Sequence, residues 1–139
     1  MDSSEIIIID NGSKDNSHAW IKHNYPNIKT IQNSKNLGVT AAWSQGLQLS
    51  SGQYICIANN DLIFSKNCVE VLQKTLEKHK WIGLASPYTY QDGNRNVPFF
   101  ALPAVAYAKN NFDEYKKHNR IGYTGWCFMF RKKDSLKGF

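Results

Sequence analysis

The chain has 139 residues, about the length of one domain, with 42% hydrophobic and 20% charged residues. This composition is ordinary for a globular protein and argues against a disordered chain. The apolar runs at 6–9 and 98–108 are too short to span a bilayer or are broken by proline. Met1 is followed by polar and acidic residues without a basic segment, so we expect no signal peptide and a cytoplasmic location.

The formal net charge is +6, and basic residues gather late in the chain, within 109–120 and 131–137. Such a bias suits an anionic ligand, a nucleic acid or an acidic membrane face, and it equally suits a solvated surface. Charge alone therefore leaves the class of partner open.

Three cysteines, Cys56, Cys68 and Cys127, lie far apart and form no C-x-x-C pair. This spacing argues against a zinc knuckle or a disulfide framework. Cys56 and Cys127 fall inside apolar runs, so we expect both to be buried thiols that act as small hydrophobic side chains. The four histidines, among them His18 and His23, show no spacing typical of metal ligands.

Short apolar strands alternate with helical patterns, which predicts an α/β fold with a mostly parallel sheet. The chain shows no internal repeat and no linker. Strands are expected over 5–10, 28–32, 54–58, 82–86 and 125–131, and helices from a cap at 15–17 to near Pro26, over 39–49, from 67 to about 80, and over 109–118.

Turn and cap residues separate these elements. Asp92-Gly93 suggests a turn, and Gly52 is expected to close the helix over 39–49. Asn67, with Glu70 three residues later, resembles a capping pair for the next helix. The core face of that helix is expected to comprise Val69, Leu72 and Leu76.

Two carboxylates, Asp10 and Asp61, each end an apolar strand. Ligands of open α/β sheets bind at the carboxyl ends of the strands, so parallel strands would place both residues along one rim. Asn59 and Asn60 precede Asp61, and a lone strand-end aspartate suits Mg²⁺, which often uses one or two carboxylates plus substrate phosphates and waters. Asparagine and aspartate are also common turn residues, so this cluster alone does not decide between a site and a turn.

Three segments together resemble the motifs of family-2 glycosyltransferases. Residues 5–17 (EIIIIDNGSKDNS) resemble the second-strand motif, and 36–38 (NLG) resemble the next motif, where a loop opens a helix. Residues 52–61 (GQYICIANND) resemble the strand that leads into the D-x-D motif. The segments come in the family's order and spacing, and 122–131 with 138–139 is similar to the family's later strand and the glycine before its catalytic segment.

The resemblance implies a GT-A-like (Rossmann-like) fold, mostly parallel and flanked by helices, with 1–139 as a single partial domain that binds the nucleotide-sugar. Asp10 matches the aspartate that recognises the nucleotide base, usually uracil or another pyrimidine. Asn36 and Gly38 match the loop beside the nucleotide, and Asn60 is expected at the same site. No catalytic residue can be assigned.

The resemblance also implies a divalent metal. Asp61 matches the last aspartate of the D-x-D motif, which holds Mg²⁺ or Mn²⁺ against the donor's diphosphate. Asn59 occupies the first acidic position of that motif, where asparagine is a weaker ligand. Gly125 and Trp126 match the strand that lines the sugar and acceptor pocket.

Two parts of the family pattern have no counterpart. The family's first strand precedes the one matched by 5–10, and its catalytic acidic residue follows the step matched by Gly138-Phe139. We therefore expect a chain truncated at both ends, either a fragment or a degenerate stand-alone protein. We expect such a chain to have little or no transferase activity, and either to be marginally stable or to self-associate through exposed sheet edges.

The leading hypothesis is an inverting transferase of the hexosyltransferase type. It would take a UDP- or dTDP-sugar as donor and a glycan or lipid-linked acceptor, with peripheral contact at the inner face of the membrane. The alternative is a non-catalytic nucleotide- or glycan-binding remnant that acts as an interaction module. Nucleic-acid binding ranks last, because no fold motif supports it, and we expect no nucleic-acid partner.

Overall fold

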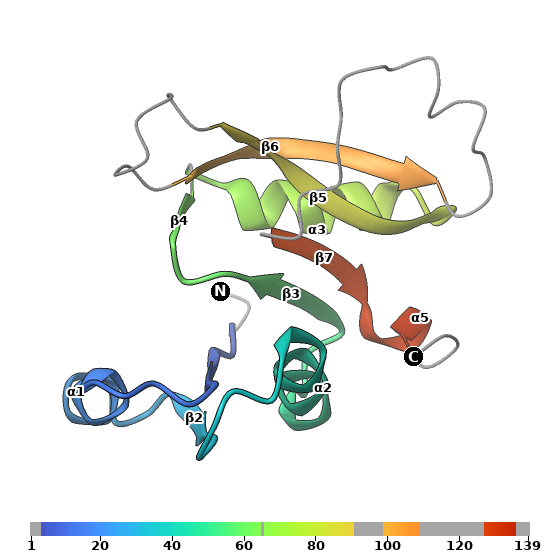
Figure 1. Cartoon of the computed structure of the whole chain (residues 1–139). Coiled ribbons are helices and arrows are strands. Elements are labelled where there is room, and N and C mark those ends of the chain that lie inside the picture. The colour runs from blue at the N-terminus through green and yellow to red at the C-terminus, as the bar shows by residue number, and fades with distance from the viewer. Residues whose placement is uncertain (1–3, 65, 91–98, 109–126, 136–139) are drawn as a thin grey trace. The chain divides into compact units, whose positions relative to one another are not determined.

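A computed structural model describes residues 4–64, 66–90, 99–108 and 127–135, with the backbone alone for 88–90 and 99–108. The chain forms two compact units, Met1–Gly52 and Gln53–Phe139, which are considered separately. The first unit contains β1 (Ile7–Asp10), α1 (Ser17–Asn24), β2 (Lys29–Gln32) and α2 (Val39–Leu49) (Figure 1). The second contains β3 (Tyr54–Ala58), β4 (Leu62–Phe64), α3 (Cys68–Lys78), β5 (Ile82–Tyr90), β6 (Phe99–Ala108), β7 (Cys127–Arg131) and α5 (Lys132–Ser135).

In the first unit, β1 and β2 form a parallel pair in which Ile7 lies opposite Lys29 and Asp10 opposite Gln32. Parallel neighbours need a crossover connection, which α1 supplies. Helix α2 packs on β1, since a Cβ added to Gly46 would lie 3.7 Å from Cγ1 of Ile9. The isoleucines of β1 are half-buried.

Glu5 joins three parts of this unit. One of its carboxylate oxygens accepts a hydrogen bond from Nζ of Lys29 at 2.5 Å. The other accepts bonds from the backbone N and the Oγ of Ser51, at 2.9 and 3.1 Å. The Lys29 and Ser51 hydrogen bonds lower the pKa of Glu5 from 4.5 to about 2.

This lowered pKa gives an expected pH dependence. The folded state holds the charged carboxylate, so the stabilisation is complete above pH 4.5 and is lost as the pH falls toward 2. We expect the free energy of unfolding of Met1–Gly52 to fall over this interval in the wild type and to fall less in Glu5→Gln. Urea titration at each pH, followed by hydrogen exchange of the β1 and β2 amides, would measure this free energy.

Glu70→Gln is the matched control, because it removes one surface carboxylate from the second unit, where Glu70 pairs with Lys74. It should leave the β1 and β2 amides unaffected. If wild type and Glu5→Gln differed in free energy of unfolding by the same amount at pH 6 and pH 2, the lowered pKa of Glu5 would not be the cause.

The second unit contains a five-stranded sheet in the order β3-β7-β5-β6-β4. β7 pairs antiparallel with both β3 and β5, β5 pairs antiparallel with β6, and β4 pairs parallel with β6. The α/β class was predicted correctly, whereas the described pairings are mixed rather than mostly parallel. Strands β4 and β6 were not predicted, because β4 has three residues and β6 contains Pro103.

Helix α3 supplies the core of this unit. Cys68, Leu72 and Leu76 recur every four residues and are almost fully buried, and they cluster with Ile82, Ala85 and Met129. This spacing places the three side chains on one helix face. Val69 is 44% exposed, so the prediction that it belongs to the core is wrong. Cys68, one position earlier, takes the place on the buried face.

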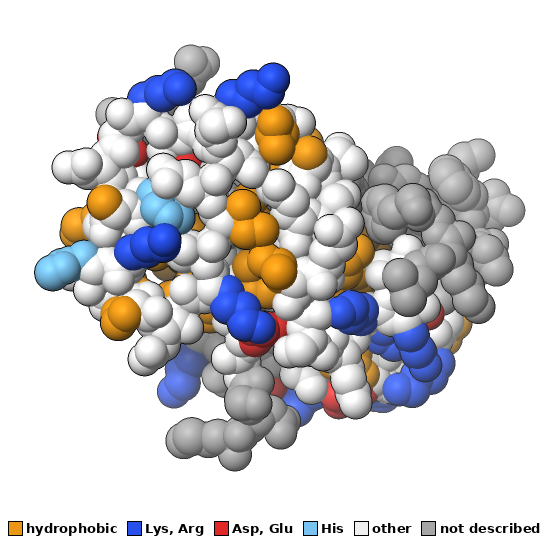
Figure 2. Space-filling model, turned by 90° about the horizontal axis from the view of Figure 1, so that it is seen from below, with side chains coloured by type: hydrophobic (Ala, Val, Ile, Leu, Met, Phe, Trp, Pro, Cys, Tyr) orange, Lys and Arg blue, Asp and Glu red, His pale blue; other side chains and the backbone are white. Residues whose placement is uncertain are grey.

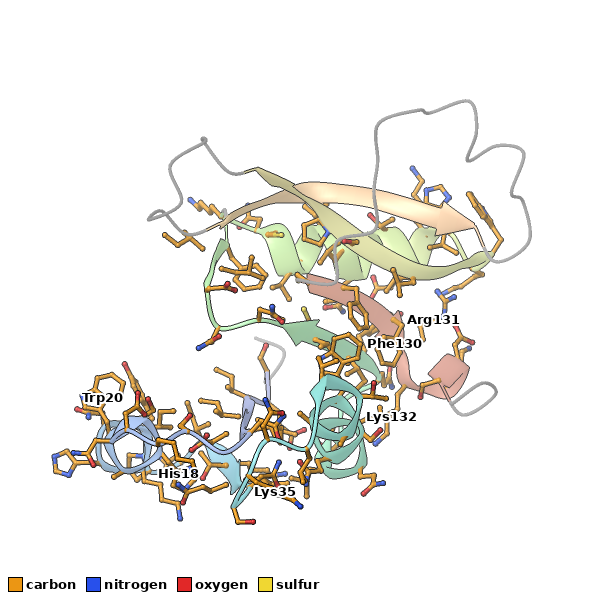
Figure 3. The ribbon with its side chains drawn as sticks, in the orientation of Figure 1. His18, Trp20, Lys35, Phe130, Arg131 and Lys132 are labelled. Carbon is orange, nitrogen blue, oxygen red and sulfur yellow. The ribbon has the colours of Figure 1, made fainter. Side chains whose placement is uncertain are left out.

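Arg131 connects the end of α3 to the strands. Its side chain is buried and donates to the carbonyl oxygens of Leu76 at 2.8 Å, of Lys80 at 3.2 Å, and of Ile82. Its Nε donates to a carboxylate oxygen of Asp134 in α5 at 2.7 Å. The last carbonyls of a helix have no partner within the helix. Arg131, at the end of β7 (Figure 3), satisfies one of them in α3.

Two predicted helix caps were wrong. Helix α2 ends at Leu49, and its C-cap is Ser50, which has extended backbone angles and whose N–H donates to the Gly46 carbonyl at 3.0 Å. Gly52 does not take part in that cap. Asn67 precedes α3 in the left-handed conformation, with φ 64°, and makes no side-chain cap bond. Glu70 pairs with Lys74 instead of reaching back to Asn67.

Candidate functional site

Asp10 lies at the carboxyl end of β1 and is buried, with 5% of its surface exposed. Its Oδ1 accepts a hydrogen bond from the backbone N of Ser13 at 2.8 Å. Gly12 allows this tight loop with φ +91°, and a Cβ at this position would lie 2.6 Å from the carbonyl carbon of Lys35. The loop after β1 therefore runs directly against the segment before α2.

The other carboxylate oxygen of Asp10 has no hydrogen-bond partner among the described residues, although it is buried. Nδ1 of His18 lies 3.8 Å from this oxygen and has no hydrogen-bond partner among the described residues either (Figure 3 shows His18 on α1). Hydrogen bonds from Ser13, and to a lesser degree the charge of His18, lower the pKa of Asp10. The residue is therefore an anionic acceptor with one free oxygen.

A network of side-chain amides holds the neighbouring loop. Nδ2 of Asn11 donates to Oδ1 of Asn36 at 2.9 Å and to the Gly38 carbonyl at 3.1 Å. Nδ2 of Asn33 donates to Oδ1 of Asn11 at 3.1 Å. Asn33 and Gln45 also exchange two bonds, at 2.9 and 3.0 Å. The network ties the 36–38 loop to both strand ends and to α2.

The structure thus brings Asp10, Asn36 and Gly38 to one end of the β1–β2 pair. Gly38 has φ +86° and stands at the start of α2, where no side chain caps the first backbone N–H groups. Such N–H groups favour anions. Asn11 lies inside the 5–17 motif segment, but no role was predicted for it. The sequence did not indicate Asn33, Gln45 or His18, because their spacing matches no motif and only the fold places them here.

Asn59, Asn60 and Asp61 connect β3 to β4 in the second unit. Asn59 is half-buried, and Asn60 and Asp61 are exposed. The described residues contain no group of three or more His, Cys, Asp or Glu side chains that could hold a metal ion. One carboxylate and neighbouring amide oxygens suit a hard cation whose remaining ligands are phosphates and waters. The shared rim of Asp10 and Asp61 stays a prediction.

Positive charge does not mark a site by itself. In Figure 2, Lys and Arg side chains are spread over the visible face, singly or in small groups. Half of the late basic residues, those at 109–120, lie outside the described residues, as do Gly125, Trp126, Gly138 and Phe139. The turn expected at 92–93 and the helix expected over 109–118 lie outside them as well. Across the described ranges no helix has the length and hydropathy needed to cross a membrane.

The family described as "Glycosyl transferase family 2" matches residues 2–139. The chain belongs to this family. The parallel and antiparallel strand pairings flanked by helices are those of a GT-A-like fold, which the resemblance implied. The motif segments at 5–17, 36–38 and 52–61 all fall within the match.

Two curated glycosyltransferases are similar to part of the chain. "Glycosyltransferase GlyG" of Streptococcus pneumoniae serotype 4 is 29% identical over 101 residues, which cover 69% of this chain and 33% of that protein. "Uncharacterized glycosyltransferase MG060" of Mycoplasma genitalium is 27% identical over 90 residues, which cover 60% of this chain and 30% of that protein. The chain therefore spans about a third of the length of these relatives.

Proposed function

We propose that this family-2 glycosyltransferase chain, as one partial GT-A domain, binds a nucleotide-diphospho-sugar together with a divalent metal. The whole reaction would be inverting transfer of a hexosyl group to a glycan or lipid-linked acceptor. One observation carries the proposal: the buried, anionic Asp10 keeps a carboxylate oxygen without a partner among the described residues. A buried acceptor of this kind is costly unless a ligand donor completes it.

The nucleotide is proposed to bind at the end of β1. A pyrimidine such as uracil or thymine carries a ring N–H, which could donate to the free oxygen of Asp10. Asn36 and Gly38 would border the same nucleotide, since Asn11 ties their loop to the end of β1. The N–H groups at the start of α2, which no described side chain caps, favour a nearby phosphate. This supports a UDP- or dTDP-sugar as donor.

The diphosphate is proposed to meet Asp61 and Asn59, with Asn60 beside the nucleotide. These two residues offer oxygen ligands that suit Mg²⁺ or Mn²⁺ when phosphates complete the shell. When bound, the metal supplies Lewis-acid stabilisation of the charge that grows on the leaving diphosphate. Gly125 and Trp126 are proposed to border the sugar and acceptor. No residue is assigned as the general base that removes the proton of the acceptor hydroxyl.

Calorimetric titration of UDP, with and without Mn²⁺, tests the proposal. Asp10→Asn keeps the size of the side chain and removes its charge, and we expect it to weaken UDP binding about tenfold or more. Asp61→Ala should abolish the gain in affinity from Mn²⁺ and leave metal-free binding unchanged, because Asp61 is proposed to act through the metal.

Asp15→Asn is the matched control, since it removes one exposed carboxylate from the same loop, where Asp15 accepts from the Ser17 N–H at 3.0 Å. It should bind UDP as the wild type does. The proposal fails if the wild type does not bind UDP, or if Asp10→Asn binds it equally well. A chain that binds UDP but transfers no sugar would be a nucleotide-binding module.

A further inference from the structure

Two cysteines meet on neighbouring strands of the second unit. In the antiparallel pair of β3 and β7, Cys56 lies opposite Met129 and Ala58 lies opposite Cys127. Cys56 and Cys127 are therefore diagonal neighbours on the same face of the sheet, where side chains remain within reach of one another. Their sulfur atoms are 3.9 Å apart, close to van der Waals contact.

The two thiols have different surroundings. β3 is an edge strand of the described sheet, and Cys56 is exposed, contrary to the prediction that it is buried. Cys127 lies on β7, between β3 and β5, and is fully buried as predicted.

The contact between the sulfurs also shifts the pKa values of the two thiols in opposite directions. A hydrogen bond from the Cys127 thiol lowers the pKa of Cys56, whereas the same contact and burial raise the pKa of Cys127. The thiolate, which is the nucleophile, is thus favoured on the exposed sulfur. An exposed thiolate beside a second thiol is the arrangement typical of redox-sensitive cysteines.

We propose that Cys56 and Cys127 form an oxidisable dithiol, in which exposed Cys56 reacts first with a low-molecular-weight disulfide and Cys127 then closes a β3–β7 disulfide. This inference does not depend on the proposed nucleotide site. Its consequence is a covalent link between β7 and the strand that leads into Asn59–Asp61.

The two steps balance for glutathione disulfide. The Cys56 thiolate attacks one sulfur of the disulfide, which forms a mixed disulfide and releases one glutathione thiolate. The Cys127 thiol then loses its proton to solvent and attacks the sulfur of Cys56, which releases the second glutathione thiolate. The protein loses two electrons and two protons, and both glutathione thiolates are protonated by water.

Oxidation of the reduced full chain in glutathione buffers tests the inference. After an acid quench, unfolding and alkylation, peptide mass spectrometry should show a Cys56–Cys127 disulfide and the loss of two alkylatable thiols. Cys56→Ser should leave the remaining thiols reduced. Cys68→Ala should oxidise as the wild type does, because Cys68 belongs to the core around Leu72 and Leu76.

A stable glutathione adduct on Cys56 with Cys127 still alkylatable would overturn the proposal, as would a Cys68–Cys127 disulfide. The rate of native-state alkylation gives a second measurement. Because Cys127 lowers the pKa of Cys56, Cys127→Ala should slow alkylation of Cys56 several-fold. An unchanged rate in a folded Cys127→Ala variant would show that the two thiols act independently.

Discussion

Arg131→Met is expected to lower the free energy of unfolding of the Gln53–Phe139 unit by about 3–5 kcal/mol. The substitution keeps an apolar side chain of similar length but removes every donor of the guanidinium. The carbonyls of Leu76, Lys80 and Ile82 and the carboxylate of Asp134 would then lose these hydrogen bonds. Buried polar groups left without partners cost far more than the net value of the bonds they made.

Urea unfolding followed by hydrogen exchange of α3 and β5 amides measures this effect within the unit. Lys133→Met is the matched control, because Lys133 is exposed and lies two positions away. It should change the free energy of unfolding by about 0.5 kcal/mol or less. Arg131→Lys should recover part of the loss, since an ammonium cannot reach all four partners at once. A loss below about 1 kcal/mol in Arg131→Met would contradict this role.

Gly12→Ala is expected to cost the Met1–Gly52 unit about 3 kcal/mol or more. Two penalties add at this position. The backbone has φ +91°, which L residues with a Cβ rarely adopt, and the new Cβ would lie 2.6 Å from the backbone of Lys35. The clash involves main chain, so no side-chain rotation relieves it. The loop that presents Asp10 would have to move away from the 35–36 segment.

Gly38→Ala separates the two penalties. Gly38 also has a positive φ, of +86°, but a Cβ there meets nothing within 4 Å. We expect a cost of about 1–2 kcal/mol from the backbone conformation alone. Thermal melting and hydrogen exchange of β1 and β2 would compare the variants. Equal losses in both would show that contact with Lys35 contributes nothing.

The sequence predicted correctly the helices and strands whose apolar periodicity and flanking turn residues match the way they pack in the structure. The helix over 39–49 and the strand over 54–58 were predicted with their observed bounds, because apolar periodicity and flanking turn residues mark both ends. The motif segments also placed Asp10, Asn36 and Gly38 near one another. The structure supports that arrangement through the bonds of Asn11.

The remaining features depend on tertiary contacts that no local pattern encodes. Arg131 looked like part of a basic surface for an anionic ligand, yet it is buried and bonds to backbone carbonyls. Cys56 sits in an apolar run, yet it is exposed. The spacing of His18 is not typical of a metal ligand. Its Nδ1 comes within 3.8 Å of Asp10 only because the chain turns back after β1 to form α1.

The pairing of β3 with β7 also bears on the order in which the chain folds. β1, β2 and α2 are near one another in sequence, so the first unit can form while later residues are still being synthesised. β3 must wait for its partner, since Cys56 and Cys127 are 71 positions apart. Closing so long a loop is slow compared with local pairing. The strand that precedes the proposed metal ligands is therefore expected to acquire its final pairing late, after the loop that follows β1 in the first unit is in place.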